Sequence, residues 1–153
     1  MIAKSGLEAW SATRVTALKP ACRRWLHGQG VCEENAESGA AEVVAALETT
    51  LASESGRWVL ANHPEAAAEQ AWSSAEGDVT VNHVIDRIFV VDGCRWIIDY
   101  KTVRVADAEL EQRAESYRPQ LERYASLFAD GRLPLRQAVF FPVQGRLVEL
   151  PKR

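Results

Sequence analysis

The chain has 153 residues, of which 47% are hydrophobic, and its 18 basic and 21 acidic side chains give a net charge of −3. This length predicts one domain with a single ordinary core. The longest apolar runs, such as Ile88–Val91, are too short to cross a bilayer, so we expect a soluble, cytoplasmic protein without membrane contact. The acidic balance argues against a free-standing nucleic-acid binder, which usually carries a basic excess.

The first part of the chain is expected to be helical. Pro20 interrupts a loose helical pattern, and a new helix is predicted to start there. Apolar residues then recur at helical spacing from Ala40 to Leu51, which predicts an amphipathic helix over residues 35–54. We expect Ser55-Gly56 to end this helix and its apolar stripe to pack on a sheet.

Strands are predicted after residue 65. Residues 66–73 suit a first strand, which includes Glu69, although their alanines would suit a helix as well. A polar turn is expected over residues 74–78, and Val79 starts a strand that reaches Asp86. His83 is an odd number of residues from Asp86, so alternation places it on the opposite face of the sheet.

Asp92-Gly93 stands between two apolar, β-branched runs, which is a strong indication of a two-residue hairpin turn. With these two residues in the turn, the pairing runs back in register until Asp86 lies opposite Asp99. Alternation places Lys101 on the same face as Asp99. The hairpin therefore brings two carboxylates and an ammonium together.

Like charges opposite each other destabilise a sheet, and a shared divalent cation is the simplest compensation. Hard oxygen ligands suit Mg²⁺ or Mn²⁺. Asp86 and Asp99 are the predicted metal ligands, with the Tyr100 carbonyl as a further ligand, and Lys101 is expected to orient a water or neutralise a scissile phosphate. The alternative is an ordinary ion pair of Asp99 with Lys101 or Arg87 on an exposed strand.

The remainder of the chain is expected to frame this site. Residues 102–112 read as a loop that overhangs the site, so Thr102 and the nearby Arg87 are candidate contacts to the substrate backbone. A helix is predicted over residues 116–129, with Gln120 and Tyr124 adjacent on its surface. The alternative is that Tyr124 is a core residue and Gln120 a boundary residue. Two further strands are predicted over residues 136–142 and 146–150.

Three motifs in order, I-D-R, I-I-D-Y-K-T and Y-R-P-Q-L-E-R-Y, resemble the RecB/AddA-type nuclease domain of the PD-(D/E)xK superfamily, which is fused to the end of some DNA-repair helicases. The resemblance covers about residues 56–150. It implies an α/β fold with a restriction-endonuclease-like mixed β-sheet flanked by helices. It also implies that Gln120 and Tyr124 contact DNA as a Q-x-x-x-Y motif, and that Glu69 in the first strand lies near the site.

The resulting hypothesis is a Mg²⁺-dependent deoxyribonuclease, an exonuclease that acts on DNA with a helicase domain in the same parent chain or in a partner subunit. RecB-type domains complete the metal site with an upstream histidine, for which His27 is unsuited. We therefore expect a fragment with a helical part (residues 1–55) and a nuclease core (residues 56–150), which binds metal weakly and cleaves little alone.

The rival hypothesis is a catalytically silent nuclease-fold module that binds DNA or a partner protein. The acidic balance and the missing histidine support it, whereas the intact set of Asp86, Asp99 and Lys101 argues against it. The cysteines are odd in number and lack C-x-x-C spacing, so we expect reduced thiols and no iron–sulfur cluster. These are Cys22, Cys32 and Cys94.

Overall fold

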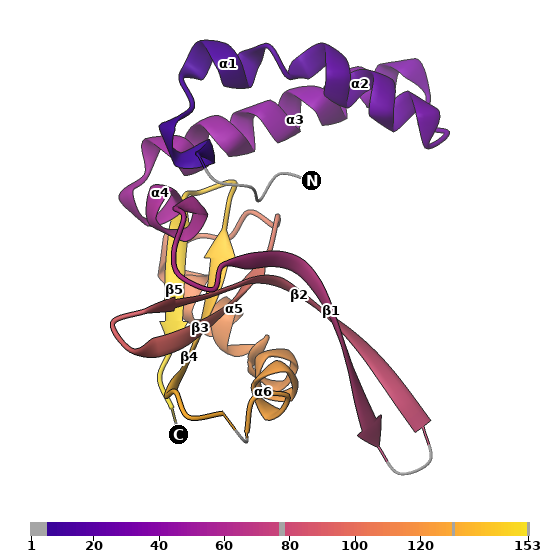
Figure 1. Cartoon of the computed structure of the whole chain (residues 1–153). Helices are drawn as coiled ribbons and strands as arrows, with labels where there is room; N and C mark the ends of the chain where they lie inside the picture. The colour runs from indigo at the N-terminus through magenta and orange to yellow at the C-terminus, as the bar shows by residue number, and fades with distance from the viewer. Residues whose placement is uncertain (1–5, 77–78, 130, 153) are drawn as a thin grey trace. The chain divides into compact units, whose positions relative to one another are not determined.

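The computed structural model of the protein describes residues 6–76, 79–129 and 131–152 (Figure 1). The chain divides into two compact units. The sheet unit comprises Asn62–Phe141 and Leu147–Arg153, and the helical unit comprises Ile2–Ala61 and Pro142–Arg146. Within the described ranges, no helix is long and apolar enough to cross a membrane.

The helical unit consists mainly of short helical segments and one long helix. In chain order they are η1 (Leu7–Ala9), α1 (Ala12–Thr16), α2 (Lys19–Gly28), α3 (Glu33–Ala52) and α4 (Glu54–Leu60). The predicted end of the long helix at Ser55-Gly56 is wrong. Ser53 has an extended backbone, and its Oγ accepts the Gly56 N–H at 2.9 Å, so Ser53 ends α3 and caps α4.

Helix α3 packs on α2 and α4 within the helical unit. Gly39 lies where Leu26 of α2 approaches, and a Cβ at Gly39 would stand 3.1 Å from Leu26 Cδ1. Ala36 and Ala40 on the same helix are fully buried. Small side chains thus let the two helices approach closely. The predicted packing of α3 on the sheet stays a prediction.

The sheet unit is built on five strands in the order β1-β2-β3-β4-β5. They are β1 (Ala67–Glu76), β2 (Val79–Val91), β3 (Cys94–Tyr100), β4 (Leu135–Phe141) and β5 (Arg146–Leu150). Neighbours β1, β2 and β3 pair antiparallel, and β3 pairs parallel with β4. The polar turn predicted over residues 74–78 is wrong for its first part, because β1 continues to Glu76; Gly77 and Asp78 lie outside the described residues.

The hairpin between β2 and β3 has the predicted turn and register. Asp92 has φ 50° and Gly93 has φ 71°, the left-handed conformations that a two-residue turn of this kind requires. Val91 pairs with Cys94, and the pairing continues to Arg87 opposite Ile98. The hairpin prediction is therefore confirmed by the ladder, and its register leads on to Asp86 and Asp99.

After β3 the chain forms a loop and three helical segments, η2 (Asp107–Glu109), α5 (Leu110–Glu115) and α6 (Arg118–Ser126). The loop predicted over residues 102–112 is wrong in its second half. Leu110 and Ala114 are four residues apart and both buried, so one face of a short helix is packed although its sequence is polar. Pro119 lies in the first turn of α6, as predicted, where its missing N–H costs nothing.

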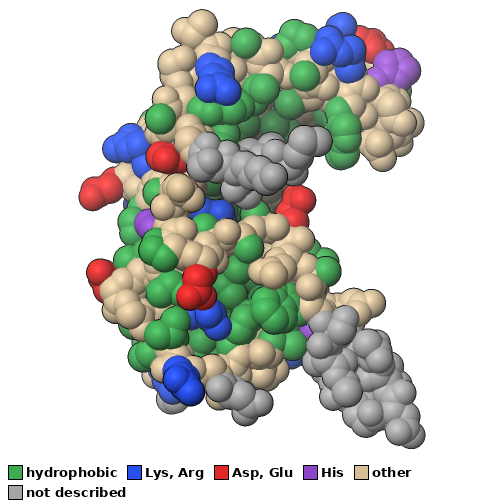
Figure 2. Space-filling view, in the orientation of Figure 1, with side chains coloured by type: hydrophobic (Ala, Val, Ile, Leu, Met, Phe, Trp, Pro, Cys, Tyr) green, Lys and Arg blue, Asp and Glu red, His purple; other side chains and the backbone are tan. Residues whose placement is uncertain are grey.

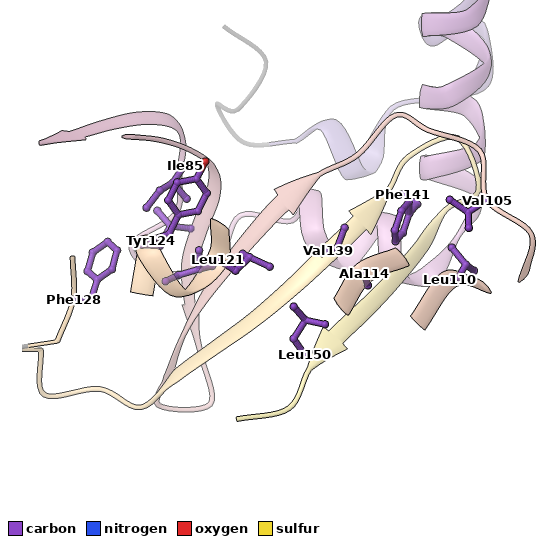
Figure 3. Close-up of a cluster of buried hydrophobic side chains, with 12 residues drawn as sticks. Ile85, Val105, Leu110, Ala114, Leu121, Tyr124, Phe128, Val139, Phe141 and Leu150 are labelled. Atoms are coloured by element: carbon purple, nitrogen blue, oxygen red, sulfur yellow. The ribbon is translucent and has the colours of Figure 1, made fainter. Parts of the chain in front are cut away.

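The core of the sheet unit lies between the sheet and helices α5 and α6 (Figures 1 and 3). Leu121 and Tyr124 of α6 are buried with Ile85 of β2, and Val139 and Phe141 come from β4. Because α6 covers this face, its Gln120 lies close to Asp99 and Lys101 at the end of β3. The fold thereby brings a helix against the predicted site.

Candidate active site

Asp99 stands near the end of β3, which has β2 on one side and β4 on the other. It pairs with Val139 in the parallel ladder to β4. Its side chain is only 2% exposed, although the strand around it is apolar. A buried carboxylate needs compensating partners, since the charged form loses its hydration.

Asp86 lies next in register after the last pair of the β2–β3 ladder, Arg87 with Ile98. Its Oδ2 accepts a hydrogen bond of 2.7 Å from the backbone N–H of Tyr100. The half-buried Asp86 carboxylate thus reaches the end of β3, next to Asp99. The predicted meeting of two acidic side chains occurs, with a side chain of one strand bound to the backbone of the other.

The environment shifts the acidity of two groups here. Burial raises the pKa of the Asp99 carboxyl above its ordinary value; the neighbouring Lys101 ammonium opposes this, and the Asp86 carboxylate adds to it. Burial also raises the pKa of the Tyr100 hydroxyl, so that it stays protonated at neutral pH. Asp99 is buried and Asp86 is half-buried beside it, so the two carboxylates together attract a positive charge.

Lys101 supplies such a charge. Its Nζ lies 2.7 Å from Asp99 Oδ2, and its side chain is 22% exposed. This contact is an ion pair without the angles of a regular hydrogen bond, so Asp99 Oδ2 is left with no hydrogen-bond donor. Lys101 Nζ also donates to Gln120 Oε1 at 3.1 Å and lies 4.7 Å from the centre of the Tyr117 ring.

Gln120 and Tyr124 of α6 complete this group of side chains. Gln120 Nε2 donates to Asp99 Oδ1 at 2.9 Å and to the Tyr124 hydroxyl at 2.7 Å. The sequence predicts that Gln120 and Tyr124 are adjacent on the helix, and the hydrogen bond between them agrees with that prediction. The polar atoms of Gln120 are directed at other side chains of the protein.

Three other predicted site residues are Arg87, Thr102 and Glu69. Arg87 is 3% exposed, and its guanidinium lies 5.6 Å from the centre of the Phe89 ring. It is therefore enclosed in the protein, away from a surface that a substrate could contact. Thr102 is exposed in the loop directly after Lys101.

Glu69 is exposed and has an unusual backbone for a strand residue, with φ 50°. The β1–β2 ladder is interrupted there, between the pairs Ala68 with Arg87 and Gln70 with Ile85. Glu69 is thus level with Asp86 in the register. A non-glycine residue in this conformation is strained, and such strain is typical of functional sites.

A family model described as the PD-(D/E)XK nuclease superfamily matches residues 7–152. The chain belongs to this superfamily. A search of curated proteins found no match. The predicted α/β fold, a mixed sheet flanked by helices, is confirmed by the five-stranded sheet and by the family. The assignment of Asp99, Tyr100 and Lys101 to the D-x-K pattern, and of Asp86 to the upstream acidic residue, stays a prediction from the sequence.

Nucleases of this superfamily generally use divalent metal ions, and the oxygen atoms at the end of β3 fit such an ion. Asp99 Oδ2 is buried and makes no hydrogen bond besides its ion pair with Lys101, and the Asp86 carboxylate is beside it. Mg²⁺ is commonly bound through one or two carboxylates while it keeps several waters. Among the described residues, no three His, Cys, Asp or Glu side chains form a metal-binding cluster. Asp86, Asp99 and the Tyr100 carbonyl stay the predicted ligands.

Two aromatic residues near this PD-(D/E)XK site lie outside the predicted set. Tyr117 contacts Lys101, and its position three residues before Gln120 could have revealed this. His83 is buried and lies edge-on to Tyr124, with ring centres 6.1 Å apart. The placement of His83 on the face opposite Asp86 stays a prediction, and the contact with Tyr124 shows that His83 faces α6.

The basic residues near the site do not form one phosphate-binding surface. Arg95 pairs with Glu65 at 2.6 Å, and the buried Arg118 pairs with Glu115 at 2.6 Å, so both are engaged within the protein. Three others are exposed: Arg104, Arg113 and Arg123. Figure 2 shows Lys and Arg scattered among acidic and apolar side chains on the visible face. Arg104, Arg113 and Arg123 are therefore the arginines of this part of the chain that are exposed and could contact a phosphate.

Proposed function

We propose that this PD-(D/E)XK domain is a divalent-metal-dependent deoxyribonuclease that hydrolyses phosphodiester bonds. The observation that supports the proposal is the distance of 2.7 Å between Lys101 Nζ and Oδ2 of the buried Asp99. The nearby Asp86 carboxylate also raises the pKa of Asp99. Such an arrangement is costly for stability alone, because an apolar core at the same place would need no buried charges. It is well suited to hold a cation beside an ammonium.

In this proposal Asp86 and Asp99 would hold Mg²⁺ or Mn²⁺ together with the Tyr100 carbonyl. When bound, the ion would polarise a phosphate oxygen and lower the pKa of a bound water. Lys101 would neutralise negative charge that develops on the scissile phosphate. Asp86 would also hold the end of β3 in place through the Tyr100 N–H.

Substrate contacts are proposed for residues around this centre. Thr102 is exposed directly after the D-x-K strand, and Arg104 and Arg113 are exposed farther along the chain. These side chains could bind the DNA backbone without reading its sequence. Gln120 and Tyr124 stay predicted DNA contacts, and Glu69 stays a predicted neighbour of the metal. Arg87 has less support, because it is enclosed in the protein.

The wider role is proposed from the resemblance to RecB/AddA-type domains. We propose an exonuclease that acts with a helicase, in the same parent chain or in a partner subunit, during DNA repair or recombination. The scattered basic residues and the net charge of −3 support reliance on another module for most of the grip on DNA.

The test is hydrolysis of end-labelled single-stranded and double-stranded DNA with Mg²⁺, with Mn²⁺ and with a chelator. We expect weak cleavage by this chain that requires the metal and that falls by at least about a hundredfold in Lys101→Ala, as for the loss of one electrostatic group at a reacting centre. Lys152→Ala, which removes an exposed lysine near the end of the chain, serves as the matched control. Equal cleavage by the Lys101→Ala variant would remove Lys101 from the chemistry.

The second candidate is a silent nuclease-fold module for binding DNA or a partner protein. It is favoured by the lack of a three-ligand cluster among the described residues. DNA binding without any metal-dependent cleavage, unchanged in Asp99→Ala, would support this alternative. The same binding assay with Mn²⁺ separates it from the nuclease, whose DNA contacts should depend on the ion.

A further inference from the structure

The hydrogen bonds of Gln120 suggest a role other than contact with substrate. Its Oε1 accepts from Lys101 Nζ at 3.1 Å, and its Nε2 donates to Asp99 Oδ1 at 2.9 Å and to the Tyr124 hydroxyl at 2.7 Å. An ammonium can only donate and a carboxylate can only accept, so the reversed amide would face two repulsive neighbours. The orientation of the Gln120 amide is therefore determined by Lys101 and Asp99.

Both oxygens of Asp99 already have a partner from this group. Lys101 Nζ lies at Oδ2, and Gln120 Nε2 lies at Oδ1. The Lys101 ammonium thus stands where a cation would neutralise the buried carboxylate. Two positive charges cannot share Oδ2 at this distance without strong repulsion, so a divalent cation bound to Asp99 requires Lys101 to move.

Lys101 has two other contacts that remain when it leaves Asp99 Oδ2. One is the uncharged acceptor Gln120 Oε1, and the other is the face of the Tyr117 ring. An ammonium that is only 22% exposed needs such partners, because water reaches it poorly. The amide oxygen is the better of the two, since it accepts a direct hydrogen bond.

We propose that Gln120 is a positioning residue: when a divalent cation binds Asp99 and displaces Lys101, the Gln120 amide oxygen holds the Lys101 ammonium beside the ion. The inference rests on the proposed function, because it concerns the same metal ligands. It assigns Gln120 to holding the lysine beside the ion rather than to binding DNA. Without the amide, Lys101 stays on Asp99 and competes with the cation.

The test measures Mn²⁺ affinity, by isothermal titration calorimetry and by the electron paramagnetic resonance of free Mn²⁺, in the whole chain without DNA. Four proteins form a double-mutant cycle: the native chain, Gln120→Met, Lys101→Met and the double variant. Methionine keeps an unbranched side chain of similar length and removes the amide or the ammonium. Gln112→Met, an exposed glutamine of α5, is the matched control.

We expect Gln120→Met to weaken Mn²⁺ binding roughly tenfold, as for loss of a hydrogen bond to a charged group. Lys101→Met should bind Mn²⁺ more tightly than the native chain, because the competing charge is gone. In that background, Gln120→Met should leave the affinity within about a factor of two or raise it. Gln112→Met should match the native chain.

Two results would overturn the inference. One is an unchanged Mn²⁺ affinity in Gln120→Met, and the other is the same loss with and without Lys101, which would mean that Gln120 acts on Asp99 directly. Thermal unfolding checks that each variant is folded, and Gln120→Leu replaces Gln120→Met if that variant is not.

The proposed nuclease function fails separately. Mn²⁺ binding with the expected coupling but without DNA hydrolysis would refute the nuclease function and leave the role of Gln120 intact. A native chain that binds no Mn²⁺ would overturn both, because no cation would then displace Lys101.

Discussion

Replacing Lys101 with methionine removes the ammonium that faces Asp99 and keeps a side chain of similar length. Lys101 Nζ lies 2.7 Å from Asp99 Oδ2, and the carboxylate is 2% exposed. In the variant, Asp99 keeps the hydrogen bond from Gln120 but loses its counter-ion. We therefore expect the metal-free protein to lose stability, because a buried charge is left without an opposite charge.

The size of the loss follows from burial. Breaking a buried ion pair typically costs about 3–5 kcal/mol. Lys101 is 22% exposed and Gln120 still donates to Asp99, so we expect about 2–3 kcal/mol. For a protein of this size, each kcal/mol lowers the melting temperature by about 2–4 °C, which gives a fall of about 4–12 °C.

Thermal unfolding followed by circular dichroism measures this fall, and Lys19→Met is the matched control. Lys19 Nζ lies 2.6 Å from Glu37 Oε1, as close as the Lys101 pair, but the two side chains are 38% and 50% exposed. Solvent screens an exposed pair, so we expect no measurable change in the control. An equal fall in both variants would refute the role of burial.

The loss should depend on pH in a defined direction. Burial raises the pKa of Asp99 and Lys101 opposes it, so removal of Lys101 raises that pKa further. The folded protein then holds the Asp99 proton more tightly than the unfolded chain does, and stability falls as the pH rises above about 4, the ordinary value. The variant should match the native protein well below the ordinary value, at about pH 2.5, where Asp99 is protonated in both the folded and the unfolded state. A loss as large at that pH as at neutral pH would contradict the explanation.

Further predictions concern turns and the Asp86 carboxylate. Gly93→Ala should lower the free energy of unfolding, measured with urea, by about 1 kcal/mol because of the positive φ at this position. Gly145→Ala should lower it by about 2–4 kcal/mol, because a Cβ there would also stand 2.8 Å from Ser53 Cβ. Equal losses would contradict this packing. Asp86→Ala should be less stable than Asp86→Asn by about 1–2 kcal/mol, since asparagine can still accept the Tyr100 N–H; equal melting temperatures would show that this hydrogen bond is unimportant.

Several features of the site follow from local rules that act along the chain. Asp92-Gly93 favours a two-residue turn, and that turn sets the register of β2 and β3. Alternation then places Asp99 and Lys101 on one face of the sheet. Their hydrogen bonds to the same residue, Gln120, agree with this placement. The spacing of Gln120 and Tyr124 on a helix follows in the same way.

Other features depend on contacts between distant segments. The helix boundary at Ser53 follows from a cap, and α5 forms because Leu110 and Ala114 become buried in the core. The packing of His83 against Tyr124 joins β2 to α6, and no pattern within β2 predicts it. The enclosure of Arg87 is likewise a result of packing.

The sequence by itself determined the hairpin, its register and the acidic pair with its lysine, because turn chemistry and side-chain alternation act over a few neighbouring residues. Only the tertiary structure decided which partners these groups have. The hydrogen bonds of Gln120 to Asp99 and Lys101 join residues 21 and 19 positions apart. They exist because the apolar face of α6 packs on the sheet, and that packing depends on shape and burial across the whole sheet unit.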